Sequence, residues 1–461
     1  MLNANTLAII YLISASLFIL GLKGLTHPST ARRGNYLAMI GMVLAISATL
    51  LSPAVQNYSL IFIGLAIGAV IGISIALKID MKAMPQLVAA FHSLVGLTAV
   101  LVAIGTFTEH AAVGVIDKVM LVELSVGSFI GAITFTGSLI AFVKLQGILS
   151  GNPVVFKGQH LFNLLLGLVS LALVVQFTQS SSLTVLLVVT AIALALGFLL
   201  IIPIGGADMP VVVSMLNSYS GWAAAATGFT LGNHALIVTG ALVGFSGAIL
   251  SYIMCKAMNR SFISVILGGF GGEEDAEGGA AHAANQGVKS AAVEDLAFMI
   301  ENANRLIVVP GYGMAVAQAQ HALKELTDVL DDRGVEIKFA IHPVAGRMPG
   351  HMNVLLAEAD IPYDHVAEMD EINPDFSTTD VALVVGANDV TNPAAKTDKS
   401  SPIYGMPILD VDKAKYVFVI KRSMRPGYSG IENLVFFQGN CSRVFGVAGE
   451  VCESLVLELG W

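Results

Sequence analysis

The sequence predicts two structures in series: an α-helical membrane bundle of about nine transmembrane helices, followed by a doubly wound α/β domain on a parallel sheet. The mean hydropathy is +0.77 and only 12% of the 461 residues are charged, whereas a soluble domain carries roughly 25% charged residues. Apolar stretches long enough to cross a bilayer fill the front half. Short β-branched runs alternate with helical patterns in the rear half.

Charge separates the two halves. Of the 24 Lys and Arg residues ten lie at or before Arg260, and of the 33 Asp and Glu residues only five do, so the front half is net +5 and the rest −14. An acidic rear half is a poor partner for nucleic acid, and we expect none. The three cysteines are too few for a disulfide framework and favour a reducing compartment.

Nine apolar stretches of about 20 residues predict the membrane helices. They lie near residues 5–25, 36–55, 59–77, 86–107, 120–143, 160–178, 182–204, 210–229 and 235–255. The first cation, Lys23, follows the first apolar run instead of preceding it. This order is the reverse of a secretory signal, so we expect the first run to be a retained membrane helix.

The distribution of cations predicts the orientation of this multi-pass chain. With the N-terminus outside, nine of the ten front-half cations fall on the cytoplasmic side and only Lys118 falls opposite, as the positive-inside rule requires. An odd number of spans then places the rear half in the cytoplasm.

Two predicted helices carry polar residues that could move protons. His92 lies about a turn and a half into the fourth, and ionisable groups at such depth usually face a bundle interior or a water path. In the eighth, Ser214, Asn217, Ser218 and Gly221 share one face. A proton relay and a hydrogen-bonded structural histidine with an asparagine clamp both fit this pattern.

Small residues and one acid in the front half predict helix packing and a structural or coupling role for the acid. Stripes such as Gly127, Gly131 and Thr134 predict close helix packing. Asp208 lies in a tight turn before the eighth helix, where it could cap that helix or couple it to the soluble domain.

A linker rich in Gly, Ala and acid spans residues 261–289, and the α/β pattern occupies 290–461. Strands are expected near 305–309, 335–341, 365–369, 380–385 and 416–420, with a helix near 313–332. The first strand leads into Gly311 and Gly313, with Val316 where a third glycine of a Rossmann-like fingerprint would stand. Such a turn cradles a pyrophosphate at a helix N-terminus, although a purely structural glycine turn is the alternative.

The other strand ends favour NADP(H) over NAD(H). No acid follows the second strand to bind a ribose 2′-hydroxyl, and Gly346 and Arg347 stand there instead. The fourth strand ends in the polar turn from Gly386 to Pro393, which is either a binding loop or an Asx turn. The fifth is followed by Lys421-Arg-Ser423, two cations and a hydroxyl suited to an extra phosphate.

The chain resembles, over nearly its whole length, the β subunit of the proton-translocating NAD(P)⁺ transhydrogenase family. The matching motifs are Gly205-Gly-Ala-Asp-Met-Pro-Val-Val-Val-Ser-Met-Leu-Asn-Ser-Tyr-Ser-Gly-Trp222, Pro310-Gly-Tyr-Gly-Met-Ala-Val-Ala-Gln318, His342-Pro-Val-Ala-Gly-Arg-Met-Pro-Gly-His351, Gly386-Ala-Asn-Asp389 and Lys421-Arg-Ser423.

The resemblance implies a membrane proton-channel domain (1–260), a flexible linker (261–289) and an NADP(H)-binding domain (290–461) that holds the nucleotide reversed relative to an ordinary Rossmann site. It assigns His92 and Asn217 to the proton path, Asp208 to its cytoplasmic end, and Asp389 to the loop that couples cofactor state to the membrane. The implied cofactor contacts are Gly311, Tyr312, Gly313, Val344, Ala345, Gly346, Arg347, Met348, Pro349, Gly386, Ala387, Asn388, Asp389, Val390, Gly405, Met406, Lys421, Arg422, Ser423, Met424, Arg425, Pro426, Gly427 and Tyr428.

Within this cofactor site, Lys421, Arg422 and Ser423 would hold the 2′-phosphate, and the loop through Gly427 and Tyr428 would close as a lid. Close relatives are expected to have an acid where this chain has Val447. A minor cofactor contact at that position is therefore expected to differ.

The resemblance also implies that the chain is half an enzyme, active only with an α subunit that binds NAD(H). Direct hydride transfer between NADH and NADP⁺ would be coupled to proton translocation across a bacterial inner membrane, by a dimer of αβ units. No flavin or metal motif is visible in the sequence. One alternative is a channel or transporter gated by a cytoplasmic nucleotide-sensing domain. The other alternative is a membrane NADPH oxidase or quinone reductase, but the sequence lacks the paired haem histidines that such an enzyme would need.

Overall fold

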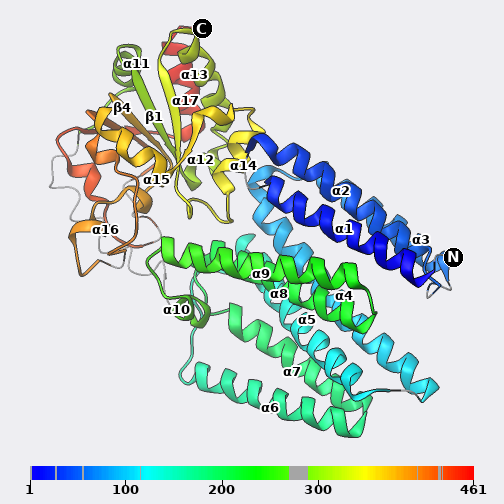
Figure 1. The fold of residues 1–461 in the computed structure, drawn as a ribbon. Helices are drawn as coiled ribbons and strands as arrows, with labels where there is room; N and C mark the ends of the chain where they lie inside the picture. Colours follow the sequence, from blue (N-terminus) through cyan, green and yellow to red (C-terminus); the bar gives the residue numbers. More distant parts are fainter. Residues whose placement is uncertain are drawn as a thin grey trace. The chain divides into compact units, whose positions relative to one another are not determined.

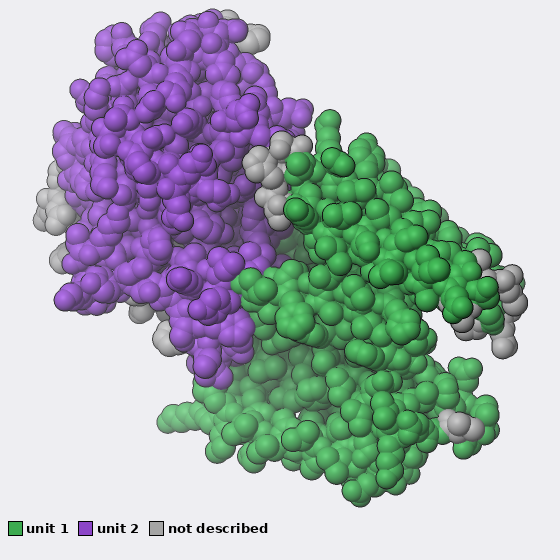
Figure 2. Space-filling view, in the orientation of Figure 1, with its two compact units in different colours: residues 1–143, 156–202, 215–249 green, residues 144–155, 203–214, 250–461 purple. Residues whose placement is uncertain are grey.

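The computed structural model describes residues 3–25, 28–53, 55, 57–114, 116–268, 289–401, 403–423, 427 and 429–460. The chain divides into two compact units, coloured in Figure 2. Unit 1 comprises residues 1–143, 156–202 and 215–249, and unit 2 comprises 144–155, 203–214 and 250–461.

All nine apolar stretches form helices in the described residues (Figure 1). They are α1 (Ala4–Leu25), α2 (Pro28–Leu50), α3 (Tyr58–Ala76), α4 (Met84–Val113), α5 (Lys118–Leu145), α6 (Gln159–Ser180), α7 (Leu183–Ile201), α8 (Met209–Thr230) and α9 (His234–Ala257). Eight of these are long and apolar enough to cross a membrane. The remaining helix, α8, is less apolar because Ser214, Asn217 and Ser218 lie on it. Helix α2 begins eight residues before the predicted stretch. The prediction followed apolar residues only and so left out the first two turns, which contain Ser, Thr and two Arg.

Small residues bring helices of unit 1 into close contact, as the sequence predicted. A Cβ atom placed on Gly96 of α4 would lie 2.5 Å from the carbonyl oxygen of Gly131 on α5, and the reverse substitution would meet the Gly96 carbonyl at 2.7 Å. Ser93 donates a hydrogen bond to the Phe135 carbonyl at 3.1 Å beside this crossing. Without a hydrophobic force between helices in lipid, such backbone approach and hydrogen bonding hold helices together.

The start of the predicted linker is ordered into a short helix. Ser261 accepts a hydrogen bond from the Ser264 N–H and caps α10 (Phe262–Leu267). The apolar sequence of this segment favours a helix more than the Gly- and acid-rich composition that follows. Residues 269–288 of the predicted linker lie outside the described residues.

Unit 2 contains a six-stranded parallel sheet with the order β3-β2-β1-β4-β5-β6, the doubly wound arrangement predicted from the sequence. The strands are β1 (Arg305–Pro310), β2 (Glu336–Ile341), β3 (Val366–Glu368), β4 (Val381–Val385), β5 (Tyr416–Lys421) and β6 (Cys441–Phe445). Five match the predicted strands within a residue or two, and β6 was not predicted.

The predicted helix near 313–332 is wrong as a single element. It is divided into α12 (Tyr312–Ala317) and α13 (Gln320–Asp332), because Gln318 adopts a left-handed conformation with φ of 51°. The interruption separates the turn that follows β1 from the longer amphipathic helix that covers the sheet.

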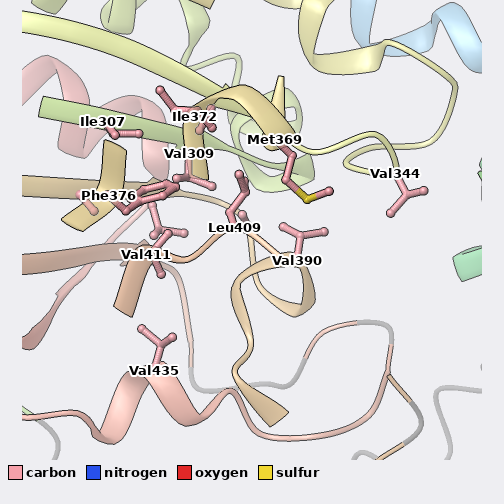
Figure 3. Close-up of a cluster of buried hydrophobic side chains, with 14 of the residues drawn as sticks. Ile307, Val309, Val344, Met369, Ile372, Phe376, Val390, Leu409, Val411 and Val435 are labelled. Atoms are coloured by element: carbon pink, nitrogen blue, oxygen red, sulfur yellow. The ribbon is translucent and has the colours of Figure 1, made fainter. Parts of the chain in front are cut away.

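Helices and apolar loops cover the two faces of the sheet. α13 packs against α17 (Ala448–Glu458), and α11 (Val293–Glu301) also contacts α17 (Figure 1). On the other face Ile307 and Val309 of β1 join Phe376 and Leu409 in a buried apolar cluster (Figure 3). The alternation of side chains along each strand produces these two cores. Because all strands are parallel, the loops that follow β1, β2, β4 and β5 meet at one edge of the sheet.

Candidate functional site

The loops after β1 and β4 touch main chain to main chain at the centre of this edge. The N–H of Gly311 donates to the Val385 carbonyl, and the N–H of Gly313 donates to the Gly386 carbonyl, both at 2.9 Å. A Cβ atom on Gly313 would lie 2.7 Å from the Cα of Gly386, and one on Gly311 would collide with the backbone of Ala387. Both predicted glycines are therefore required by the neighbouring loop, before any ligand is considered.

The loop after β2 is organised by two buried histidines. His342 accepts a hydrogen bond at Nδ1 from the Val344 N–H, at 3.3 Å, and its Nε2 faces the Pro407 carbonyl at 2.9 Å. His351 accepts at Nδ1 from the Arg347 N–H, at 3.0 Å. Burial lowers the pKa of each imidazole to about 4, with the Arg347 charge adding to the effect at His351. Both side chains are therefore neutral at neutral pH.

Arg347 lies over the ring of Tyr312, with its guanidinium carbon 4.4 Å from the ring centroid. The His351 ring lies 6.2 Å from the same ring, tilted by 48°. Gly346, with φ of 106°, allows this packing, because a Cβ there would lie 2.5 Å from the His351 Nδ1. The structure thus brings together the predicted Tyr312, Gly346 and Arg347, around a histidine that was not predicted as a site residue.

The loop after β4 reaches the segment after β5 through Asp389. This buried carboxylate accepts hydrogen bonds from the N–H and the hydroxyl of Ser429, at 3.2 and 2.6 Å. Gly427 packs so closely that any Cβ there would collide with the carboxylate. The predicted coupling residue and the predicted lid segment are therefore in direct contact.

At the far side of the edge, Lys421 is half-buried whereas Arg422 and Ser423 are exposed. The Lys421 ammonium lies 4.8 Å from the centroid of the Phe436 ring. Burial lowers the pKa of Lys421 to about 8; the Asp389 carboxylate opposes that shift, and the Arg443 charge adds to it. A dianion bound nearby would stabilise the charged form of Lys421 in this partly buried setting.

The other predicted contacts are less accessible as side chains. Val344, Ala345, Met348, Ala387 and Val390 are buried, as is Met406, which packs in a small cluster with Ile403 and Ile408. Pro349 is partly exposed, and Gly405 has a φ of 80° and donates its N–H to the Ala395 carbonyl at 2.7 Å. The calls on Met424, Arg425, Pro426 and Tyr428 lie outside the described residues.

In unit 1, the structure brings His92 and Asn217 together. The His92 Nε2 lies 3.2 Å from the Asn217 Oδ1 and so joins α4 to α8. Within the described part of the chain the buried Nδ1 of His92 has no hydrogen-bond partner. With the Asn217 oxygen as acceptor, Nε2 carries the hydrogen and the Nδ1 lone pair is available.

The rest of the predicted polar stripe on α8 serves packing. Ser218 donates to the Gly244 carbonyl on α9 at 2.6 Å, and Trp222 donates to the Ser218 hydroxyl at 3.1 Å. Gly221 lies against the backbone of Gly244. Asn217 is thus the residue of this stripe for which a hydrogen bond to His92 is observed, while Ser218 and Gly221 face α9.

In unit 2, Asp208 is fully buried and pairs with Arg260. The Arg260 Nη1 donates to its Oδ1 at 2.6 Å. Burial raises the pKa of Asp208 to about 6, although the Arg260 charge and hydrogen bond oppose the shift. The observed partner of the predicted Asp208 is therefore a cation just beyond the end of α9.

Comparison with known proteins identifies the family. A family model described as "NAD(P) transhydrogenase beta subunit" matches residues 7–458. The chain belongs to the NAD(P) transhydrogenase beta subunit family. Two relatives named "NAD(P) transhydrogenase subunit beta", both from Rhodospirillum rubrum and one from a specified strain, are each 59% identical over 451 residues. The match covers 97% of this chain and 97% of each relative.

Membership of the transhydrogenase beta subunit family gives the site a coarse identity. The family uses nicotinamide nucleotides, and the name "beta subunit" implies an alpha subunit as partner. Helices apolar enough to span a membrane agree with a multi-pass membrane protein. The resemblance inferred from the sequence motifs is confirmed.

Buried polar atoms at the sheet edge fit a transhydrogenase nucleotide site. Among the described residues, both side-chain polar atoms of Asn388 and the Nε2 of His351 are buried without hydrogen-bond partners. Buried polar groups are rarely left so, because each unsatisfied group costs about 1–3 kcal/mol. A polar ligand with donors and acceptors would satisfy them.

Three residues of the sheet domain of this transhydrogenase chain were not predicted as site residues from the sequence: Ser429, His351 and Arg443. Ser429 follows the predicted lid, and only its contact with Asp389 distinguishes it from other loop serines. His351 was quoted only within a motif, although its position four residues after Arg347 on a tight loop was a usable signal. Arg443 lies on the strand that was not predicted.

Proposed function

We propose that the chain binds NADP(H) at the carboxyl edge of its sheet. Two features of the sequence at the strand ends carry this assignment. Lys421, Arg422 and Ser423 stand at the end of β5, and no acid follows β2. Two cations and a hydroxyl suit a 2′-phosphate, whereas an NAD site wants a carboxylate for the ribose 2′-hydroxyl. The proposed nucleotide domain is residues 290–461, after a linker at 261–289.

The residues of the edge would each contribute a distinct contact. Tyr312, held by Arg347 and His351, offers an aromatic face, and the Arg347 guanidinium offers a cation for the pyrophosphate. The unsatisfied amide of Asn388 can donate and accept at once. Asp389 would hold the segment at Gly427 and Ser429 over the nucleotide and so exclude water.

Hydride chemistry would be supplied by the bound nicotinamide rings, with NAD(H) on the alpha subunit. The chain itself would orient its own nucleotide, and no catalytic acid or base is needed for direct transfer between positioned rings. Activity would therefore require both subunits, with a dimer of αβ pairs as the complete assembly.

The membrane domain, residues 1–260, would couple that transfer to proton translocation. The unpartnered Nδ1 of His92 is an atom that can accept a proton, while the hydrogen bond to Asn217 fixes the ring. Asp208 would lie at the cytoplasmic end of the path. Its raised pKa of about 6 allows a change of charge near neutral pH, which would break or restore its ion pair with Arg260.

We place the chain in a bacterial inner membrane, and the positive-inside pattern supports an orientation with the N-terminus outside and the nucleotide domain in the cytoplasm. Reporter fusions at the N-terminus and after Trp461 would test this orientation. A cytoplasmic N-terminus would contradict it.

Equilibrium binding of NADP⁺ and NAD⁺ to the purified full-length chain tests the nucleotide assignment. We expect a strong preference for NADP⁺, reduced at least tenfold in Lys421→Met and in Arg422→Met, because each removes a charge-assisted contact. Equal affinity for the two nucleotides in the unmodified chain would refute the assignment. The same chain combined with the alpha subunit in inverted vesicles then tests transhydrogenation and proton pumping together.

A further inference from the structure

Arg443 is a buried cation whose side chain has no hydrogen-bond partner in the described part of the chain. Only 1% of its surface is exposed, and none of its three guanidinium nitrogens has a hydrogen-bond partner among the described residues. A guanidinium carries five N–H donors and is almost never left buried without acceptors. Its isolation calls for an anion.

The backbone of Arg443 is fixed on both sides. It pairs with Val419 of β5 in the sheet register. On its other side its N–H donates to the Lys289 carbonyl at 3.0 Å and its carbonyl accepts from the Ala291 N–H at 2.8 Å. Position 443 is therefore held in the sheet, and its side chain has no backbone freedom with which to leave the interior.

The register also places Arg443 on the same face as Lys421. Residues opposite each other in adjacent strands point to one face, and alternate residues along a strand do the same. Val419 faces Arg443, so Lys421, two residues on, shares that face. The Arg443 guanidinium carbon lies 4.5 Å from the centroid of the Phe436 ring, and the Lys421 ammonium lies 4.8 Å from the same centroid.

Among the described residues, no acid is hydrogen-bonded to the Arg443 guanidinium. Burial raises the pKa of the Cys441 thiol to about 11, so it is uncharged at neutral pH. The Glu432 carboxylate acts on Arg443 electrostatically but is not among its hydrogen-bond partners. Asp389 acts on Lys421 and is hydrogen-bonded to Ser429. The Phe436 ring faces both cations, yet a ring quadrupole offsets only part of the cost of a buried charge.

We propose that Arg443 is a further specificity-determining residue of this site, which supplies positive charge to the 2′-phosphate of bound NADP(H) beside Lys421. The inference rests on the proposed nucleotide assignment and extends it to a strand outside the Lys421-Arg-Ser423 cluster. A phosphate dianion is the ligand chemistry favoured by two cations on one face of the sheet that share the Phe436 ring, one of them fully buried without acceptors among the described residues. Free inorganic phosphate has the same chemistry, and the test separates the two sources.

Arg443→Met tests the proposal because it keeps the length of the side chain and removes its charge. Binding of NADP⁺, NAD⁺ and inorganic phosphate to the purified full-length chain is measured by calorimetry. We expect NADP⁺ affinity to fall at least tenfold, with NAD⁺ affinity unchanged, since a hydrogen bond or contact to a charged group is worth about tenfold or more. Arg443→Lys should give an intermediate ratio of the two affinities.

Stability of the nucleotide-free protein separates this role from a structural one. Removing a buried charge that has no hydrogen-bond acceptor among the described residues should leave the melting temperature of the free Arg443→Met chain equal to or above that of the unmodified chain. The rise in melting temperature caused by NADP⁺ should shrink. A structural role would lower the melting temperature both with and without nucleotide.

Each outcome decides between the possibilities. A folded Arg443→Met chain with an unchanged NADP⁺ to NAD⁺ affinity ratio overturns the inference, while an unmodified chain with no NADP⁺ preference overturns the proposed function beneath it. Loss of phosphate binding without loss of NADP⁺ binding identifies free phosphate as the ligand and also overturns the inference. Should Arg443→Met fail to fold, an unchanged affinity ratio in Arg443→Lys has the same meaning.

Discussion

The hydroxyl of Ser429 donates a 2.6 Å hydrogen bond to the Asp389 carboxylate and thereby fastens the segment after β5 to the loop after β4. The Ser429 N–H adds a second bond at 3.2 Å. These two loops follow adjacent strands, so the contact bridges the sheet edge where the nucleotide is proposed to bind. It gives the proposed lid a defined anchor.

Removing this anchor should speed the release of nucleotide. Asp389→Ala deletes two hydrogen bonds to a charged acceptor, and we expect the rate of NADP⁺ dissociation to rise about tenfold or more. Stopped-flow dilution of the loaded full-length chain measures this rate. Ser429→Ala, which keeps the carboxylate and one of the two bonds, should have a smaller effect. Equal dissociation rates in all three proteins would show that the anchor does not control release.

Gly386→Ala should destabilise the sheet domain more than its backbone conformation alone requires. Gly386 has a φ of 68°, and a Cβ there would collide with the backbone of Gly313 and Met314. Gly334→Ala is a matched control, because Gly334 has a φ of 75° with open space around it.

The control should cost about 1–2 kcal/mol, the usual cost of a left-handed conformation for a residue with a side chain. Gly386→Ala should cost several kcal/mol and abolish NADP⁺ binding. Hydrogen exchange of β1 and β4 amides in the full-length chain measures the difference. Similar protection in both variants would mean that the two loops separate easily.

His92→Ala should abolish proton pumping in inverted vesicles that contain both subunits, because no atom then accepts the proton at this position. Asn217→Leu should also impair pumping, by releasing the ring from its 3.2 Å contact. Ser218→Ala is the control on the same helix, since that hydroxyl bonds the Gly244 carbonyl. Dye quenching during reverse transhydrogenation reports the proton flux, and normal flux in His92→Ala would exclude the relay.

The sheet domain should lose stability on acidification below about pH 6.5. His342 and His351 have pKa values lowered from 6.5 to about 4 in the folded chain. The unfolded chain therefore binds more protons than the folded chain between these values. Stability from both groups is fully present above pH 6.5 and is lost as the pH falls towards 4.

His351→Asn should flatten this pH dependence without removing the acceptor for the Arg347 N–H, because the Asn oxygen can replace Nδ1. The melting temperature of the sheet domain, recorded from pH 7 to pH 4, measures the change. An unaltered acid slope in this variant would show that His351 titrates normally.

The architecture could largely be predicted from the sequence. Apolar length and β-branched runs specify helices and central strands, because these features reflect the lipid and the doubly covered sheet. The edge strand β6 escaped because Cys-Ser-Arg-Val-Phe has a charged residue at its centre. The break at Gln318 escaped because no Gly or Pro signals it.

The candidate site was only partly predictable, for a physical reason. Motifs name the residues of each strand end, but they do not show what those residues touch. The glycines after β1 proved to serve a neighbouring loop, and Ser218 and Gly221 proved to serve helix packing. Contacts between distant segments, such as Ser429 with Asp389, arise from tertiary structure and leave no local pattern.

Main-chain contact between the loops after β1 and β4 has a consequence for protein engineering. Neither Gly313 nor Gly386 can acquire a side chain unless the other loop moves, so the centre of the edge offers little room for redesign. Changes in cofactor preference would have to be introduced at the periphery, where the side chains of Arg422 and Ser423 are exposed and no close packing restricts their size. Evolution faces the same restriction, and a change of nucleotide would begin at β5 and β6.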